Sequence, residues 1–162
     1  MIKVNIKGVG LDPSQNPLLL LIDSEETMVL PIRIGLNEAQ AISLKLEGQE
    51  VPRPLTHDLI FSVCKHLDAA INKVVVNDIY EGVYYAQVFL QQNGEELIVD
   101  SRPSDGIALA LTSDSPLYIS EKVAEHTLPF EETVKENVEN VFGLEEFTEE
   151  DDEEDKGNDY LH

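Results

Sequence analysis

Two alternating apolar stretches joined by Asn93-Gly94 place the firmest constraint on how this chain can fold. Hydrophobic residues recur at every second position in "VYYAQVFLQ" and "ELIVD", which is the period of a strand with one buried face. Asn and Gly both accept the positive φ that a two-residue type I′ turn requires, so these strands are expected to form a β-hairpin. The stretch "KVVVNDIY", on the other side of Glu81-Gly82, extends the hairpin to an antiparallel meander.

A second antiparallel meander is predicted at the start of the chain. Ile2, Val4 and Ile6 alternate with polar residues, "PLLLLID" is continuously apolar, and "TMVLPIRI" puts its apolar residues on one face. Pro31 lacks a backbone donor, so we expect the third of these strands to lie at a sheet edge or to carry a bulge.

Between and after the meanders the apolar spacing becomes that of helices. "NEAQAISLKLEG" ends on Gly48, a typical helix stop, and "THDLIFSVCKHLDAAI" begins with Thr56, the expected N-cap. The second of these helices carries an apolar stripe, formed by Leu59, Ile60, Val63, Cys64 and Leu67. A helix after "DSRPSD", a strand in "PLYIS" and a short helix from Glu121 follow. The fold class is α+β: two antiparallel β-meanders with intervening helices in a single compact domain, without the glycine-rich loop of a Rossmann-type site.

The charge of the chain is concentrated in its last fifth. Its 162 residues include 32 acidic and 11 basic side chains, a net charge of −21. Residues 1–128 hold 18 acids and 9 bases, a balance of −9, whereas residues 129–162 hold 14 and 2, a balance of −12. The sequence therefore predicts a folded domain over 1–128, an amphipathic helix over 129–144 and an acidic, disordered tail over 145–162. Because the chain has no general basic surface, any phosphate ligand needs a local site or a bound cation.

The cysteine content and the apolar runs bear on where the protein is found. Cys64 is the one cysteine, so no internal disulfide can form, and its apolar surroundings predict a buried thiol. The alternating N-terminal residues do not resemble a signal peptide, and the longest apolar run, Leu18–Ile22, is too short to span a bilayer. These features predict a cytoplasmic protein that does not bind membranes. Strand edges that need covering favour a homo-oligomer.

The segments "DSRPSD" and "VPRPLTHD" hold the residues best suited to chemistry, and both stand where a helix is expected to begin. Each has an Arg-Pro dipeptide, a hydroxyl residue and an Asp before an apolar run. In a structural interpretation these residues start helices. Ser104 is the N-cap, Asp105 meets the positive end of the helix dipole, and Arg102 pairs with Asp100 or Asp105.

A functional interpretation uses the same residues. Helix N-termini bind anions, arginine forks fit phosphate, and carboxylates bind Mg²⁺ or Mn²⁺. If the two helix starts converge in space, one pocket gains the groups that phosphodiester hydrolysis needs, with His57 as the side chain that titrates near neutrality. The candidates are Arg102, Arg53, Ser104 and Thr56 for phosphate binding, Asp100 and Asp105 for a divalent metal, and Asp100, Asp105, His57, Asp58 and Glu38 for catalysis. The sequence has no P-loop, no nucleophile elbow and no zinc-ligand spacing, so we expect no organic cofactor.

Three blocks of the sequence resemble the bifunctional nuclease domain family. They are "LPIRIGLNEAQAISLKLEG", "PRPLTHDL" and "DSRPSDGIALAL", in the expected order, and the likeness covers roughly residues 1–128. The resemblance implies an α+β domain with nuclease activity on RNA and DNA, for which single strands are the expected substrate. It supplies no catalytic set, so the residues named above are candidates from their chemistry.

Two other interpretations of the sequence stay open. The chain could be a non-catalytic regulatory module that binds a protein or a small anion, in which case the Arg-Pro helix starts are structural. The acidic tail could also mimic nucleic acid and occupy a groove of its own domain as an autoinhibitor, as the uneven charge distribution suggests. A catalytic interpretation requires that the two Arg-Pro helix starts face one pocket.

Overall fold

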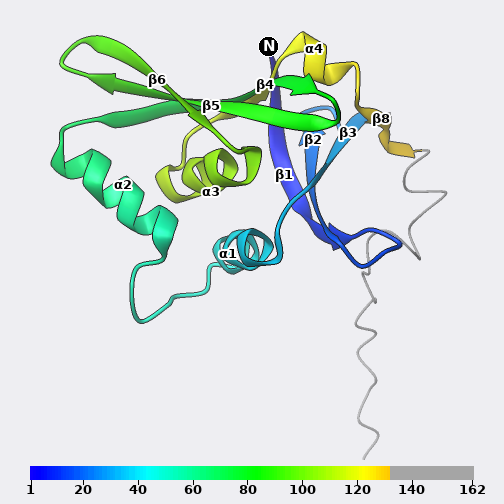
Figure 1. Ribbon diagram of the computed structural model, residues 1–162, viewed down its shortest axis with the longest axis horizontal. Coiled ribbons are helices and arrows are strands. Elements are labelled where there is room, and N and C mark those ends of the chain that lie inside the picture. Colours follow the sequence, from blue (N-terminus) through cyan, green and yellow to red (C-terminus); the bar gives the residue numbers. More distant parts are fainter. Residues whose placement is uncertain (132–162) are drawn as a thin grey trace, which may run out of the picture.

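Residues 1–131 are described by a computed structural model, in which one mixed sheet carries helices on its faces (Figure 1). In chain order, the elements are β1 (Ile2–Leu11), β2 (Pro17–Asp23), β3 (Met28–Arg33), α1 (Leu36–Leu46), α2 (Thr56–His66), β4 (Ala70–Tyr80), β5 (Val83–Gln92), β6 (Glu95–Ser101), α3 (Pro103–Ser113), β7 (Leu117–Ile119), α4 (Glu121–Ala124) and β8 (Leu128–Pro129). The α+β class predicted from the sequence is confirmed.

Both predicted meanders are present. β1, β2 and β3 pair antiparallel in sequence order, and so do β4, β5 and β6. Within the second meander Val88 lies opposite Val74 on one side and Val99 on the other. Asn93 and Gly94 have φ of 51° and 80°, so the β5–β6 connection is the tight hairpin turn that these two residues favour.

One continuous sheet unites the two meanders, in an arrangement that the sequence did not predict. The strand order is β6-β5-β4-β7-β1-β2-β3-β8, and β7 pairs antiparallel with β1 but parallel with β4. A three-residue strand has too short a pattern to indicate its partners. At the far end β8 pairs with Met28 and Val29, and within residues 1–131 no strand pairs with β3 on that side at Pro31, as expected.

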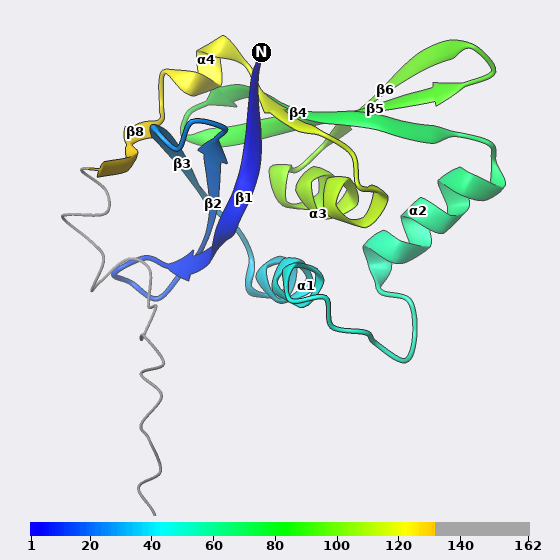
Figure 2. The same cartoon turned by 180° about the vertical axis from the view of Figure 1, so that it is seen from behind.

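Helix α3 lies at the centre of the helical layer. α1, α2 and α3 lie on one side of the sheet, and α3 contacts both other helices as well as β4 and β5 (Figures 1 and 2). Ile107 of α3 has no exposed surface, and Gly106 allows the helix to approach Val74 and Ala86 closely. The residues at the N-terminus of α3 are therefore held between the sheet and two neighbouring helices.

The apolar stripe predicted on α2 does not face the core. Leu59, Val63 and Leu67 are 60%, 49% and 60% exposed, whereas His57 is only 8% exposed. Cys64 is half-buried, so the prediction of a buried thiol was wrong. Helical spacing identifies an apolar face but does not show which surface covers it. The face of α2 that packs toward α3 is the one that carries His57.

Several predictions about the surroundings of the domain remain predictions. β6 is an edge strand whose Leu97, Ile98 and Val99 are exposed, and a homo-oligomer would cover such an edge. No helix in residues 1–131 combines the length and apolar character needed to cross a membrane. The tail over 145–162, most of the helix predicted over 129–144 and the proposed autoinhibitory contact lie outside the described residues.

Candidate active site

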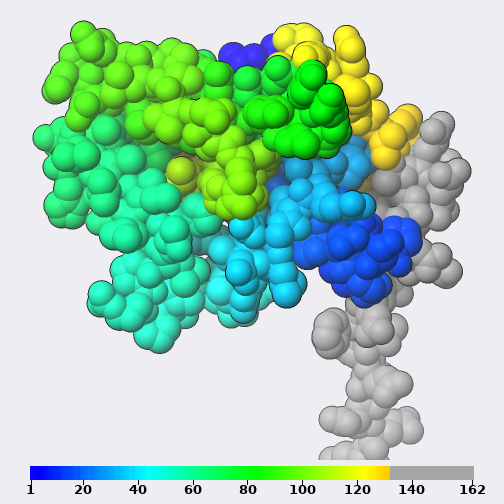
Figure 3. Space-filling model, in the orientation of Figure 1, coloured from blue at the N-terminus to red at the C-terminus, as the bar shows by residue number. Residues whose placement is uncertain are grey.

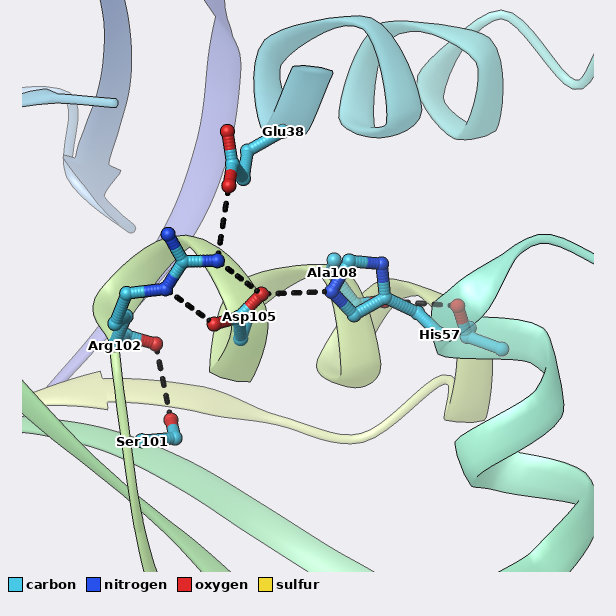
Figure 4. A network of polar contacts seen from close by, with 7 residues as sticks. Glu38, His57, Ser101, Arg102, Asp105 and Ala108 are labelled. Atoms are coloured by element: carbon cyan, nitrogen blue, oxygen red, sulfur yellow. Dashed lines mark hydrogen bonds and ion pairs between the residues drawn. The ribbon is translucent and has the colours of Figure 1, made fainter. Parts of the chain in front are cut away.

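The two Arg-Pro helix starts face each other across one site. His57 lies in the first turn of α2 and Asp105 in the first turn of α3, 48 residues further along the chain. Nε2 of His57 is 3.0 Å from Oδ1 of Asp105 (Figure 4). The convergence that a catalytic interpretation requires is therefore present for these two side chains.

Arg102 extends this pair into a network of four residues. Its Nε donates to Oδ2 of Asp105 at 2.6 Å, and its Nη2 donates to Oδ1 of the same carboxylate at 3.1 Å. Nη2 also lies 2.9 Å from Oε1 of Glu38 in α1. Glu38, Arg102, Asp105 and His57, which we call the four-residue network, thus connect α1, α3 and α2 in a continuous chain of contacts (Figure 4).

Each member of the network stands where its helix begins. Arg102 is the N-cap residue of α3 in extended conformation, and Pro103 follows at the first helical position, where its fixed φ suits the helix. Asp105 and Glu38 lie in the first turns of α3 and α1, where the helix dipole favours negative charge. A Cβ at Gly35, the N-cap of α1, would collide with the Glu38 carboxylate, so glycine leaves the space that this side chain fills.

The charges of the network reinforce one another. Burial raises the pKa of Asp105, but hydrogen bonds from Arg102 and His57 outweigh it and hold that pKa below its ordinary value. Hydrogen bonds to Asp105 and then to Glu38 raise the pKa of Arg102. Asp105 is consequently an anion, and Arg102 a cation, throughout the neutral range.

An ionised Asp105 determines which nitrogen of a neutral His57 carries the proton. A carboxylate accepts hydrogen bonds and cannot donate them, so Nε2 holds the proton and Nδ1 keeps its lone pair. In Figure 4 the Nδ1 side of the ring faces toward α1, and His57 lines a cavity of about 570 Å³ between α1, α2 and α3. The arrangement therefore offers a basic nitrogen to a molecule in this cavity, with Arg102 in the same wall.

Thr56 is not the N-cap that the sequence predicted for α2. Leu55 is the N-cap residue, and Thr56 is the first residue of the helix. Asp58 takes over the capping function because its Oδ2 accepts a hydrogen bond from the Leu55 backbone N–H at 2.9 Å. Its other oxygen pairs with Lys45 of α1, so Asp58 ties α2 to α1.

Ser104 is likewise not the N-cap of α3. Proline lacks a backbone N–H and is favoured at the first helical position, so the helix begins at Pro103 and Arg102 becomes the N-cap. Ser104 is consequently the second helical residue. It is only 6% exposed, and its hydroxyl has no hydrogen-bond partner among residues 1–131.

Two further candidates lie apart from the network. Arg53 is exposed in the loop between α1 and α2 and does not line the cavity that His57 lines. Ser101 turns toward α3, since its Oγ lies 2.9 Å from an ideal Cβ built on Gly106. Strand alternation therefore points the neighbouring Asp100 away from α3 and from Asp105.

The described residues hold no preformed metal site. In residues 1–131 no three His, Cys, Asp or Glu side chains are grouped so that they could bind an ion. Both oxygens of Asp105 already accept hydrogen bonds, from Arg102 and His57, and Asp100 points away from it. The pair Asp100 and Asp105 therefore does not fit a shared divalent ion, and the metal stays a prediction.

Asp58→Asn is expected to destabilise the domain in a pH-dependent way. Burial raises the pKa of Asp58. Hydrogen bonds from Lys45 and Leu55 lower the pKa by more than burial raises it, so the net shift is downward. A depressed folded-state pKa means that the carboxylate stabilises the fold above the unfolded value of about 3.9 and loses that effect as the pH falls. We expect a loss of about 1–2 kcal/mol in unfolding free energy at pH 7 and a smaller loss at pH 3. Urea unfolding at both pH values measures it.

Asp68→Asn is the matched control for this prediction. Asp68 follows α2 and its carboxylate makes no hydrogen bond within residues 1–131, so its replacement should cost no stability at either pH. An equal loss for Asp58→Asn at pH 7 and pH 3 would show that the charge of Asp58 does not stabilise the fold.

The comparisons with known proteins place the chain in a family. A model of the bifunctional nuclease domain matches residues 19–131, which includes every residue of the four-residue network. The chain therefore belongs to the bifunctional nuclease domain family, as its three sequence blocks indicated.

Relatives differ in how much their names say. An uncharacterized protein of Mycobacterium tuberculosis is 40% identical over 122 residues, which cover 75% of this chain and 73% of the relative. Bifunctional nuclease 1 of Oryza sativa subsp. japonica is 21% identical over 110 residues, which cover 66% of this chain and 33% of the rice protein. The chain thus matches about a third of the rice nuclease, and that likeness is distant.

Proposed function

We propose that this protein is a nuclease that hydrolyses phosphodiester bonds of RNA and single-stranded DNA at the four-residue network. The observation that carries the proposal is the 3.0 Å contact between His57 and Asp105, made in the wall of a cavity that Arg102 also lines. Membership of the bifunctional nuclease domain family and the distant likeness to a rice bifunctional nuclease support the same class of reaction.

Each residue has a definite part in the proposed reaction. Nδ1 of His57 takes a proton from the attacking water, while Asp105 holds the opposite nitrogen and stabilises the imidazolium that forms. The water oxygen bonds to phosphorus, the P–O bond to the leaving oxygen breaks, and that oxygen takes a proton from solvent. Arg102 offers its remaining N–H groups to the phosphoryl oxygens, where negative charge develops. Glu38 fixes the guanidinium from α1 and acts as a positioning residue.

Charge balance gives the reason to keep a divalent ion in the proposal. With a neutral His57, Glu38 and Asp105 outweigh Arg102 by one negative charge, and a phosphodiester adds another. Mg²⁺ or Mn²⁺ arriving with the substrate would offset this repulsion, while the roles of His57, Asp105 and Arg102 do not depend on it.

Arg102→Ala is expected to lower the rate of cleavage by about 100-fold, because it removes the cation that faces the phosphoryl group. The measurement uses end-labelled single-stranded RNA and DNA, incubated with Mg²⁺, with Mn²⁺ or with EDTA. Arg102→Lys keeps the charge but loses the planar fork, so its cleavage rate should lie between those of the wild type and Arg102→Ala. Lys73→Ala is the matched control, since Lys73 lies over the Phe89 ring on the sheet face away from α3.

The outcomes separate this proposal from a binding module. Cleavage that survives Arg102→Ala unchanged would exclude the four-residue network as the site. Wild-type protein that cleaves neither substrate under any metal condition would favour the non-catalytic, anion- or protein-binding module. Equal activity with EDTA and with added metal would remove the divalent ion from the proposal.

A further inference from the structure

A second cavity lies on the other side of Arg102. It has a volume of about 600 Å³ and is bounded by the end of β3, by the β4–β5 turn and by the first turn of α3. Figure 3 shows these three segments meeting on one face of the molecule, coloured light blue, bright green and yellow-green. Arg102 lines both this cavity and the one that His57 lines, so the two spaces share a wall.

Two arginines line this second cavity in an acidic protein. Its charged lining residues are Arg33, Arg102 and Asp12, and Arg102 also pairs with Glu38 and Asp105. Asp12 is 7% exposed and accepts hydrogen bonds from the backbone N–H groups of Ser14 and Asn16, both at 2.8 Å. It also accepts one from Nη2 of Arg33, at 2.8 Å. This contact orients Arg33 and leaves its other guanidinium N–H groups available to a ligand.

Ser104 supplies an independent sign that a ligand belongs here. It is only 6% exposed, lines the cavity and has no hydrogen-bond partner among residues 1–131. Within residues 1–131, Oδ1 of Asn77 is the one side-chain polar atom that is both fully buried and without a hydrogen-bond partner. The unpaired Ser104 hydroxyl is therefore not fully buried and remains accessible from the cavity that it lines. It stands in the first turn of α3, whose N-cap Arg102 provides no side-chain cap for the free N–H groups.

We propose that this cavity is a phosphate subsite of the nuclease, in which Arg33, Ser104 and the first turn of α3 bind the phosphate next to the one being cleaved. This inference rests on the proposed function. A strand whose scissile phosphate meets Arg102 and His57 in one cavity continues past Arg102 into the other. The substrate is therefore a single strand with at least two consecutive phosphates, and a lone phosphodiester fills only half of the site.

Arg33→Ala is expected to remove the preference for a second phosphate. Two substrates are compared for the wild-type protein: a dinucleoside monophosphate, and the same dinucleotide carrying an added terminal phosphate. The KM for the second should be about 10- to 100-fold lower, which is the effect expected of one charge-assisted hydrogen bond. In Arg33→Ala the two KM values should become similar, because the contact to the second phosphate is lost. Ser104→Ala should give a smaller change in the same direction, and Lys73→Ala should keep the preference.

A binding experiment separates failure of the subsite from failure of the nuclease. Inorganic phosphate is titrated into isotope-labelled full-length protein, followed by the NMR signals of the Ser104 and Asp105 amides and of the Arg33 side chain. Saturable shifts that Arg33→Ala abolishes support the subsite even if no cleavage occurs. Cleavage without any effect of the second phosphate, or shifts that persist in Arg33→Ala, would overturn it while leaving the nuclease proposal intact.

Discussion

Asp105→Asn is expected to lower the rate of cleavage of single-stranded RNA and DNA by about 10²- to 10⁴-fold, the contribution of a positioned general base. The asparagine amide can donate to Nε2 of His57, which moves the proton to Nδ1 and removes the lone pair with which Nδ1 would accept a proton. It also takes away the carboxylate that accepts two hydrogen bonds from Arg102. Single-turnover cleavage of a labelled oligonucleotide measures the loss.

Asp114→Asn is the matched control, because it makes the same change at the opposite end of α3. Asp114 is the C-cap in left-handed conformation, which asparagine also adopts, so activity and stability should both be kept.

The double variant His57→Ala with Asp105→Asn should cleave no more slowly than the slower of the two single variants, since the two side chains act as one unit. The proposed roles would be contradicted if the rate losses of the two single variants multiplied in the double variant, or if Asp105→Asn lowered the rate by less than about 5-fold. Asp100→Asn tests separately the metal ligand that the sequence predicted.

The residues that meet in the candidate site were predictable because their signals are local. An Arg-Pro dipeptide followed by an Asp marks a helix start, and the two such starts in this chain single out Arg102, Asp105 and His57. Glu38 is identified in the same way, as an acid in a first helical turn. Chain order could not show that α2 and α3 would begin side by side, because that depends on the sheet beneath them.

The repeated motif did not indicate which arginine shares a cavity with Arg102. It paired Arg102 with Arg53, the arginine of the matching dipeptide, which lines neither of the cavities that meet at Arg102. The arginine that shares a cavity with Arg102 is Arg33, at the end of β3. Nothing in "LPIRIG" marks Arg33, since the contact that orients it comes from Asp12, which lies 21 residues earlier in the chain.

The features that the sequence missed share a physical cause. The parallel pairing of β7 with β4 and the exposed stripe of α2 both depend on which surfaces meet in the folded domain. Apolar periodicity records that a face avoids water, and it is the same for a face covered by the core, by another chain or by nothing. Tertiary neighbours decide between these, and they are absent from a single sequence.

Gly106→Val is expected to lower the unfolding free energy by about 3 kcal/mol, because it overpacks the contact between α3 and the sheet. A Cβ at Gly106 would lie 2.9 Å from Oγ of Ser101 and 3.0 Å from Cγ1 of Val74, closer than side chains normally approach. Relief requires α3 to move, and Asp105 would move with it relative to His57. Displacement of that size can cost about 100-fold in rate, so stability and cleavage should fall together. Urea unfolding and oligonucleotide cleavage on one preparation measure both.

Gly8→Val is the matched control for this last prediction. Gly8 lies in β1, an added Cβ there meets no atom within 4 Å, and valine favours strands, so stability should stay the same or rise. The smaller substitution Gly106→Ala should also lower stability, and adding Ser101→Ala should restore part of it, because Oγ of Ser101 is the atom nearest to the new Cβ. The effects of these two substitutions on the unfolding free energy should therefore be non-additive. If Gly106→Val were as stable as wild type, α3 would not be held by close contact at this point. The position of Asp105 opposite His57 would then need another explanation, since the packing of α3 is what connects the sheet to the site.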